Sequence, residues 1–417
     1  MTRPSTRLLA ATLIDWTGTG FYLAISAIFL TRSLGLSGGQ VGLALAGVGL
    51  VAFAGSVPAG RLGDRFGHCE VLCVLHAARA AAFLGLSLGA PLWPALALLG
   101  AIGLADQAAA SMNQALVGEM VPAEERVAFM GRVRTVINIG VTLGTLPAGF
   151  ALAAGTDSFA PLLAANGASY LVAGAIVAGL PRRRLVRVAE ARRLLVPSFA
   201  TTALIAVDGV MSLWLAVLNI GLPLWIIGAT SAPASLVAVL YGTNTVLCVL
   251  LQTRVSRRVA TYVGAGSAQR LAGLLLAACC GCFAGSVVGS GPLSTALLVG
   301  AIACLTFAEL LVSSAAWRIT FALAPAGRSA EFFATYGLGK VASQIGGPIL
   351  LTSVVLVLGS PGWILLGVLF LLGAIVTPPL LRRALERPVV DRQALSSAAW
   401  SPARSGEPNT TRLRVAT

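Results

Sequence analysis

The sequence predicts an all-α membrane protein with twelve transmembrane helices, arranged as two six-helix, pseudo-symmetric bundles. Hydrophobic residues make up 57% of the chain and charged residues only 11%, whereas a soluble domain has roughly 25% charged residues. The apolar runs are about 20 residues long, as a membrane-spanning helix requires, and not alternating segments of about ten residues. The arginines gather in alternate connections between these runs, which fits an even number of membrane crossings.

The first half of the chain contains six of these runs. Arg3 and Arg7 precede the first run, which is longer than the apolar core of a signal peptide, so we expect an uncleaved first helix. Trp93 and Pro94 mark an outer turn, with the tryptophan at interface depth. The predicted helices are 8–30, 40–59, 71–89, a fourth run ending near 117, 127–154 and 159–180.

A basic segment separates this half from a second set of six runs. The segment carries six arginines, and we predict that 181–195 is a cytoplasmic linker between an N-terminal bundle, 1–180, and a C-terminal bundle, 196–381. Residues 382–417 have little to bury and are predicted to form a disordered cytoplasmic tail. The predicted helices are 196–227, 234–253, 268–288, 293–316, 329–358 and 362–381.

The positions of the arginines set the expected orientation. With these helices, 23 of the 28 arginines lie in the two tails and the loops of one side, and the outer loops hold only Arg32. Positively charged loops stay in the cytoplasm, so both termini are expected there, in a multi-pass protein of the cell membrane. The net charge of +14 is therefore read as a topology signal, and no nucleic-acid partner is expected.

A charged, glycine-containing turn follows the second run. Residues 60–72 read Gly-Arg-Leu-Gly-Asp-Arg-Phe-Gly-His-Cys-Glu-Val-Leu. This segment resembles the loop between helices 2 and 3 of the major facilitator superfamily, whose pattern is Gly-x-Leu-Ala-Asp-Arg-x-Gly-Arg-Lys-x-x-Leu. Six positions match, and the two basic positions are His68 and Cys69 here.

The resemblance implies a gate at the cytoplasmic side. The motif's carboxylate, Asp64, is expected to brace the inward-closed arrangement against the amino end of helix 11, near Ser329. The basic position, His68, is expected to meet Glu119 at the inner end of helix 4. Because histidine titrates near neutrality, this latch should weaken as cytoplasmic pH rises; alternatively His68 only caps a helix or faces water. The predicted gating hinge comprises Gly60, Asp64, Arg65, Gly67, His68 and Glu119.

Helix 5 is similar to that of drug and proton antiporters of the superfamily. Their pattern is Gly-x-x-x-Gly-Pro-x-x-Gly-Gly, which lets helices pack closely and bend. Here the proline comes two residues late and one glycine is missing. The matching residues are Gly140, Gly144, Pro147 and Gly149.

Charged residues inside the apolar runs are the candidates for coupling. A charge at mid-helix costs about 2.5–3.5 kcal/mol and usually faces a partner or a cavity. The alternatives are structural: Arg79 and Asp106 form an ion pair between helices 3 and 4, which His76 joins, and Glu309 pairs with Arg318 or Lys340. The proton-coupling candidates are Asp15, Asp208, Asp106 and Glu309, and the intramembrane charge partners are Arg79 and Lys340.

The resemblance implies a secondary active transporter that works by alternating access. We expect proton-coupled efflux of a small amphiphilic or drug-like compound; the alternatives are proton-coupled uptake of a small metabolite and a transporter-like sensor or scaffold that moves nothing. No catalytic constellation, cofactor or metal site is predicted, although Cys279, Cys280 and Cys282 lie close together. The expected partners are a small-molecule substrate, protons and membrane lipid, and the protein is expected to be a monomer.

Overall fold

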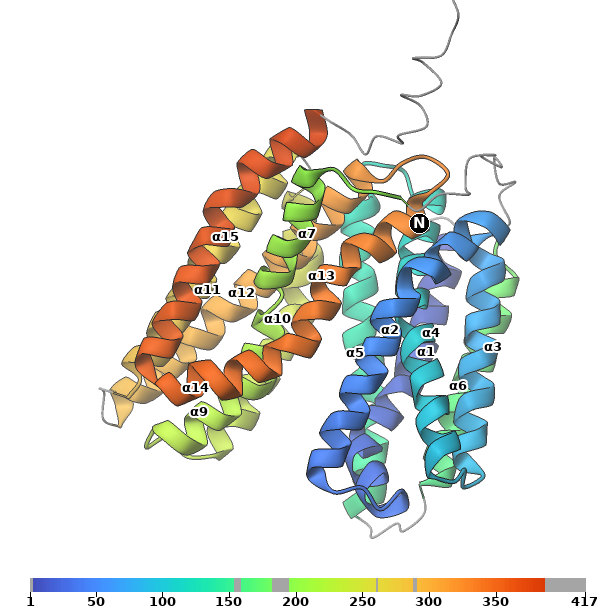
Figure 1. The fold of residues 1–417 in the computed structure, drawn as a ribbon, viewed down its shortest axis with the longest axis horizontal. Helices are drawn as coiled ribbons and strands as arrows, with labels where there is room; N and C mark the ends of the chain where they lie inside the picture. Colours follow the sequence, from blue (N-terminus) through green and yellow to red (C-terminus); the bar gives the residue numbers. More distant parts are fainter. Residues whose placement is uncertain (1–2, 154–158, 182–194, 260–261, 288–290, 387–417) are drawn as a thin grey trace, which may run out of the picture.

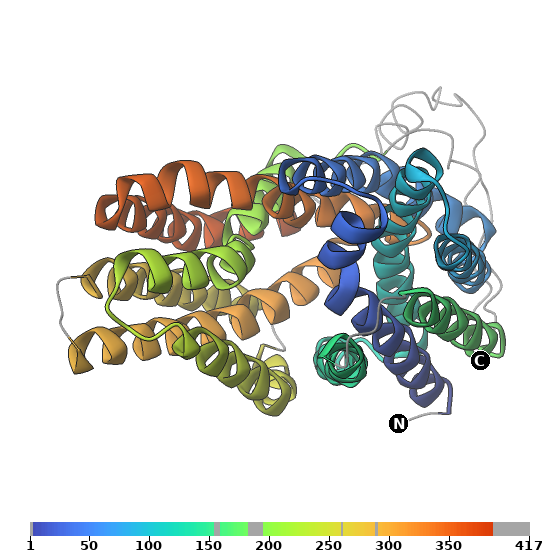
Figure 2. The ribbon, with the colours of Figure 1, turned by 90° about the horizontal axis from the view of Figure 1, so that it is seen from below.

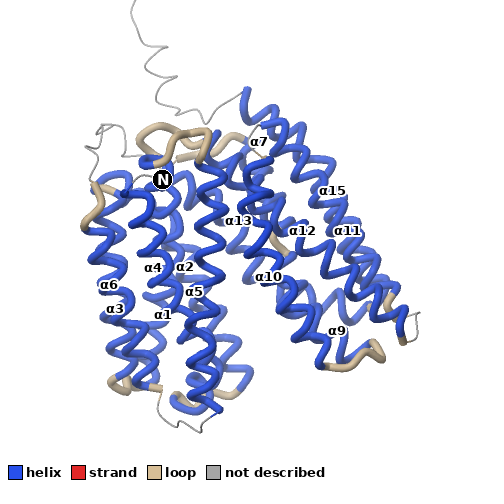
Figure 3. Tube along the Cα trace, turned by 180° about the vertical axis from the view of Figure 1, so that it is seen from behind, coloured by secondary structure: helices blue, strands red, loops and turns tan. Residues whose placement is uncertain are grey.

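The computed structural model describes residues 3–153, 159–181, 195–259, 262–287 and 291–386. These residues contain twelve helical spans long and apolar enough to cross a membrane, and no strand (Figure 3). The predicted all-α fold class is therefore confirmed. The predicted linker and nearly all of the predicted tail lie outside the described residues.

The first half contains six helices. The first of them, α1, continues as one π-helical turn, Phe29–Ser33. The six are α1 (Arg3–Ile28), α2 (Gly38–Phe66), α3 (His68–Ser87), α4 (Leu92–Met120), α5 (Arg126–Ala153) and α6 (Ala160–Ala178).

Two spans of the second half are interrupted helices. The span Phe199–Ala229 is built from α7 (Phe199–Met211), α8 (Trp214–Ala216), a π-helical turn and α9 (Leu222–Ala229). The other interrupted span joins α13 (Ser329–Leu350) through a second π-helical turn to α14 (Leu356–Leu358). The remaining helices are α10 (Ser235–Arg258), α11 (Tyr262–Gly285), α12 (Pro292–Leu323) and α15 (Ser360–Glu386).

Four predicted helix ends were early by five residues or more. Helix α2 was predicted to stop at Ala59 and reaches Phe66, and α10 extends beyond Thr253 to Arg258. Helix α12 extends beyond Ala316 to Leu323, and α15 extends beyond Leu381 to Glu386. The apolar pattern ends where a helix leaves the hydrocarbon, but the backbone hydrogen bonds continue. The charged hinge is thus mostly the last turns of α2. Its break is the single residue Gly67, whose φ of 112° favours glycine.

The helices form two bundles, seen side by side in Figure 2. In the first, α1 packs against α5 and α6, α3 against α4 and α6, and α2 against α4. In the second, α11 packs against α12 and α15, and α7 against α13 and α15. The bundles meet mainly where α2 and α4 contact α13 and where α5 contacts α10.

The buried apolar residues show that the bundles are packed together at one end only. One core cluster joins both halves and includes Leu116 and Phe129 of the first half with Phe332 of the second. The other two clusters each belong to one half, one around Phe83 and one around Trp363. The helices accordingly converge at the end where α1 begins and α15 ends, and diverge at the other (Figure 1). We refer to these as the predicted cytoplasmic end and the predicted outer end.

Glycines bring α1 and α5 into close contact. A Cβ atom on Gly140 would lie 2.9 Å from the carbonyl oxygen of Leu13, and one on Gly144 would overlap the carbonyl oxygen of Thr17. Pro147 lies within α5 and does not end it. Gly149, by contrast, has no heavy atom within 4 Å of such a Cβ. Of the three glycines of the predicted motif, two are therefore required for packing.

We predict that Gly144→Ala destabilises the protein, because the added methyl group meets backbone atoms that cannot move aside. Overpacking of this kind costs about 1–3 kcal/mol. The measurement is the thermal unfolding midpoint of the purified protein. Gly149→Ala is the matched control, since its methyl group meets open space and alanine favours a helix by about 0.5–1 kcal/mol. Equal midpoints for the two variants would contradict the prediction.

Candidate functional site

A charge cluster in the first half joins three helices. The guanidinium of Arg79, from α3, donates through Nη1 to Asp106 Oδ1 of α4 at 2.9 Å and to Asp15 Oδ1 of α1 at 3.4 Å. The Arg79 and Asp15 side chains are 3% and 7% exposed, whereas that of Asp106 is 45% exposed. The ion pair expected between Arg79 and Asp106 is therefore present, and it also includes Asp15. Two carboxylates share one cation, and one of them is accessible.

Further contacts hold the guanidinium in position. Arg79 Nη2 donates to His76 Nδ1 at 2.8 Å, so His76 accepts through that nitrogen. The guanidinium carbon lies 4.2 Å from the centroid of the Tyr170 ring, and the hydroxyl of Tyr170 is 3.1 Å from Thr19 Oγ1. Because these contacts hold the arginine in place, a proton or a cation that binds this cluster binds to its carboxylates.

A second cluster connects the two halves. Glu309, from α12, accepts a hydrogen bond from Arg134 Nη2 of α5 at 3.0 Å, and its other oxygen accepts from Asn244 Nδ2 of α10 at 3.2 Å. The alternative in which Glu309 pairs with Arg318 or Lys340 is wrong, because the ion-pair partner of Glu309 is Arg134 of the opposite half. The Glu309 side chain is only 4% exposed, so its charge needs a partner this close.

The remaining two predicted charges lie near this second cluster. Asp208, from α7, is buried, and its Oδ1 has no hydrogen-bond partner among the described residues. Lys340, from α13, is exposed and lies within electrostatic range of Arg134, Asp208 and Glu309. No carboxylate of the described chain lies within ion-pair distance of Lys340.

The Asp64 carboxylate of α2 contacts the first turn of α13. Its Oδ1 accepts from Ala330 N at 2.9 Å and its Oδ2 from Glu331 N at 2.8 Å. His68 lies next to it, with Nε2 3.0 Å from Asp64 Oδ1 and Nδ1 2.7 Å from Glu119 Oε1. Both contacts expected from the motif are present. Because both ring nitrogens face carboxylate oxygens, a doubly protonated His68 can donate to both.

The other residues of the predicted hinge have different surroundings. Gly60 lies against α13, where a Cβ would be 2.7 Å from the carbonyl oxygen of Ala330. Arg65 is exposed, and its guanidinium lies 5.1 Å from the Phe66 ring, so the structure does not bring it to the latch. Arg61 is nearer, with Nε 3.8 Å from Glu331 Oε1.

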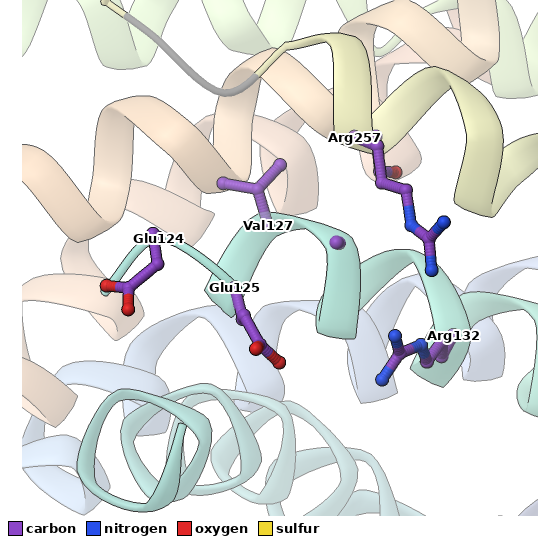
Figure 4. A pocket seen from close by; sticks show the side chains of 7 residues that line it. Glu124, Glu125, Val127, Arg132 and Arg257 are labelled. Atoms are coloured by element: carbon purple, nitrogen blue, oxygen red, sulfur yellow. The ribbon is translucent and has the colours of Figure 1, made fainter. Parts of the chain in front are cut away.

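The contact between α5 and α10 lies at the same end. A pocket there is lined by side chains that include Arg257 of α10, which extends toward α5, and Arg132 of α5 (Figure 4). Glu124 and Glu125 line the same pocket. At this end, Asp64 links α2 of the first half to α13 of the second. The contact between α5 and α10 instead contains a pocket lined by both acidic and basic side chains.

Arg134 was not among the predicted site residues. It lies within α5, the helix for which the sequence indicated only a glycine and proline packing motif. The rule that selected Asp15 and Lys340, a charge within an apolar run, also selects Arg134. Its partner, Glu309, is 175 residues away in the chain and cannot be inferred from local spacing.

Two helical halves with buried charges between membrane-length helices define a polytopic membrane protein. The comparison with protein families gives the particular family. Residues 8–349 match the model of the Major Facilitator Superfamily, and the chain belongs to that family. The resemblance seen in residues 60–72 is therefore confirmed. No curated protein sequence matches the chain.

Several solved structures share the fold. The human organic anion transporter MFSD10 (TETRAN) is 16% identical, with a TM-score of 0.71 over 90% of this chain and 99% of that one. A bacterial homologue of the iron transporter ferroportin, in an outward-facing state, is 17% identical, with a TM-score of 0.73 over 93% and 100%. The proton:xylose symporter XylE bound to 6-bromo-6-deoxy-D-glucose is 13% identical, with a TM-score of 0.73 over 94% and 98%. At these identities the likeness concerns the fold.

We predict that Asp64→Asn shifts the protein away from the conformation in which the predicted cytoplasmic ends are packed. The amide has one acceptor oxygen in place of two and no charge to oppose the positive end of α13. A lost charged hydrogen bond is worth about 1.5–3 kcal/mol. Distances between labels at Arg65→Cys and Arg258→Cys, in a background without the native cysteines, measure the shift. The exposed carboxylate of Glu124 provides the control, Glu124→Gln, and equal distances for the two variants would refute the role of Asp64.

The same distances should lengthen as pH rises in the native protein. The imidazolium donates to both Asp64 and Glu119, whereas the neutral ring donates to only one of them, so the packed conformation is favoured at low pH and loses support as His68 releases its proton. His68→Arg keeps the charge at all these pH values and should flatten the dependence. If the native and His68→Arg proteins give the same pH profile, His68 is no latch.

Proposed function

We propose that this protein is a secondary active transporter that exports a small amphiphilic or drug-like compound in exchange for protons. The observation that carries the proposal is the cluster of Asp15, Asp106 and Arg79. Two carboxylates and one guanidinium leave one negative charge in excess. Carboxylates within transmembrane helices often act as proton-binding groups in transporters.

Competition for Asp106 provides a route to exchange. Its side chain is 45% exposed, although it lies within a membrane-length helix. A proton and a positively charged or hydrogen-bonding group of a substrate then bind the same carboxylate, and each excludes the other. A carrier that changes conformation only with one of them bound exchanges the two.

The arrangement of the halves supports alternating access. With both termini in the cytoplasm, as the arginines predict, the packed end is the cytoplasmic one and the described conformation faces outward. The contacts at that end include Asp64 with α13 and Arg134 with Glu309. Both must break for the protein to face inward. In the outward-facing form, Asp106 is available to protons from outside the cell.

We predict that Asp15→Asn removes proton coupling. Without the Asp15 charge, Asp106 alone balances Arg79, so no excess negative charge remains to bind a proton and the exchange loses its driving ion while the fold remains. In everted membrane vesicles with an acidic lumen, addition of an amphiphilic compound such as ethidium should release protons from the lumen. Asp15→Asn should slow this release by at least about tenfold, a barrier increase of about 1.4 kcal/mol.

Two comparisons make this test decisive. Thermal unfolding with and without ethidium checks that Asp15→Asn still folds and binds. Asp208→Asn tests whether the second half also takes part in proton coupling. If this variant slows proton release more than Asp15→Asn does, the coupling site is Asp208 of α7. Unchanged proton release in Asp15→Asn at equal abundance contradicts the proposal. Compound-driven flux in the opposite direction would indicate uptake, and no flux of any compound would indicate a sensor or scaffold.

A further inference from the structure

We infer that the transported compound is a zwitterion, whose cationic group binds Asp106 in the first half and whose anionic group binds Lys340 in the second. This inference rests on the proposed export function and specifies its substrate. It depends on two accessible, oppositely charged side chains that lie in membrane-length helices of different halves.

Lys340 is the only lysine in the chain and lies in the middle of α13. The charged groups nearest to it belong to helices of both halves. It lies within electrostatic range of Arg134 on α5, Asp208 on α7 and Glu309 on α12. An ionised side chain at this depth is unfavourable unless an anion or water meets it.

The acids around Lys340 do not pair with it in this conformation. Glu309 is engaged by Arg134 through one oxygen and by Asn244 through the other. Asp208 is buried, and its unpartnered Oδ1 is not within ion-pair distance of the ammonium. Among the described residues, Lys340 is therefore left available for an anionic group from outside the protein.

Asp106 is available for a cation in the same way. Arg79 occupies its Oδ1, and Oδ2 accepts no hydrogen bond from the described residues. The side chain is 45% exposed, in contrast to Asp15, which shares the same arginine but is buried. A carboxylate oxygen that is accessible and unoccupied suits an ammonium or guanidinium group.

The two charges flank one contact between the halves. Helices α4 and α13 pack together, and a Cβ on Gly337 would lie 3.4 Å from Nε2 of Gln107, the residue next to Asp106. Lys340 is one helical turn from Gly337 on α13. A single small molecule can therefore reach both side chains.

A zwitterion suits this pair better than a single charge does. A ligand with only a cationic group leaves Lys340 without an anion when the site closes and water is excluded, so it binds more weakly and is exchanged more slowly than a ligand with both groups. A ligand with both groups pairs with both side chains. The cationic end still competes with a proton at Asp106, as the proposed exchange requires.

Three compounds with the same ring test this inference: tryptophan, tryptamine and indole-3-propionate carry both charges, the positive charge alone and the negative charge alone. Binding to the purified full-length protein is measured by thermal shift titration. We expect tryptophan to bind more tightly than either analogue. Lys340→Gln should weaken the binding of tryptophan and indole-3-propionate by roughly tenfold or more without weakening that of tryptamine. Asp106→Asn should weaken the binding of tryptophan and tryptamine to a similar extent without weakening that of indole-3-propionate.

This crossed pattern separates ligand contact from a loss of structure, which lowers binding of all three compounds equally. Arg270→Gln and Glu124→Gln are the charge controls, since both residues line surface pockets outside the two clusters. Binding of tryptamine or indole-3-propionate as tight as that of tryptophan, no binding of any of the three, or an equal loss for all three in Lys340→Gln overturns the inference. If binding shows the crossed pattern but no proton-linked flux occurs, the export function is wrong and the zwitterion inference stands. If proton-linked export occurs for singly charged compounds but not for zwitterions, the zwitterion inference is wrong and the export function stands.

Discussion

The Asp64 carboxylate of α2 binds the first turn of α13, and we propose that the observed conformation depends on this contact. Its two oxygens accept hydrogen bonds from Ala330 and Glu331, at the positive end of a long helix in the other half. The shared apolar core lies at this same end, whereas the outer clusters stay separate. A few polar contacts and one apolar cluster therefore hold two otherwise independent bundles in one of two arrangements.

The charges nearer the middle of the helices have a different role. Arg79 is enclosed by Asp15, Asp106, His76 and Tyr170, so its position is fixed by four neighbours. Arg134 and Glu309 instead belong to different halves, and their ion pair depends on the conformation. Charges that pair within one half keep their partners when the halves separate, so they can hold a proton or a ligand. An ion pair between the halves exists only while the ends that carry it are in contact.

The sequence allowed prediction of the features that depend on local chemistry. Apolar runs of membrane length predicted twelve spans. The resemblance of residues 60–72 to the superfamily motif implied both the contact of Asp64 with α13 and the contact of His68 with Glu119. Helix ends at Phe66 and Glu386 were missed because a helix continues beyond the hydrocarbon while hydropathy does not. The partner of Glu309 was missed because ion pairing depends on which bundles touch, and α5 contacts the second half through Arg134. The exposure of Asp106 was likewise visible only once the halves were in place.

We propose that a proton and the substrate compete for the carboxylates held by Arg79. The most direct measurement of this competition is the proton release that accompanies binding, followed with a pH indicator in weakly buffered solution as tryptophan or tryptamine is added to the purified protein. We expect protons to be released as the ligand binds, and we expect Asp106→Asn to lose this release. Ligand binding with no proton release, or with proton uptake, at every pH at which the ligand binds would contradict the competition.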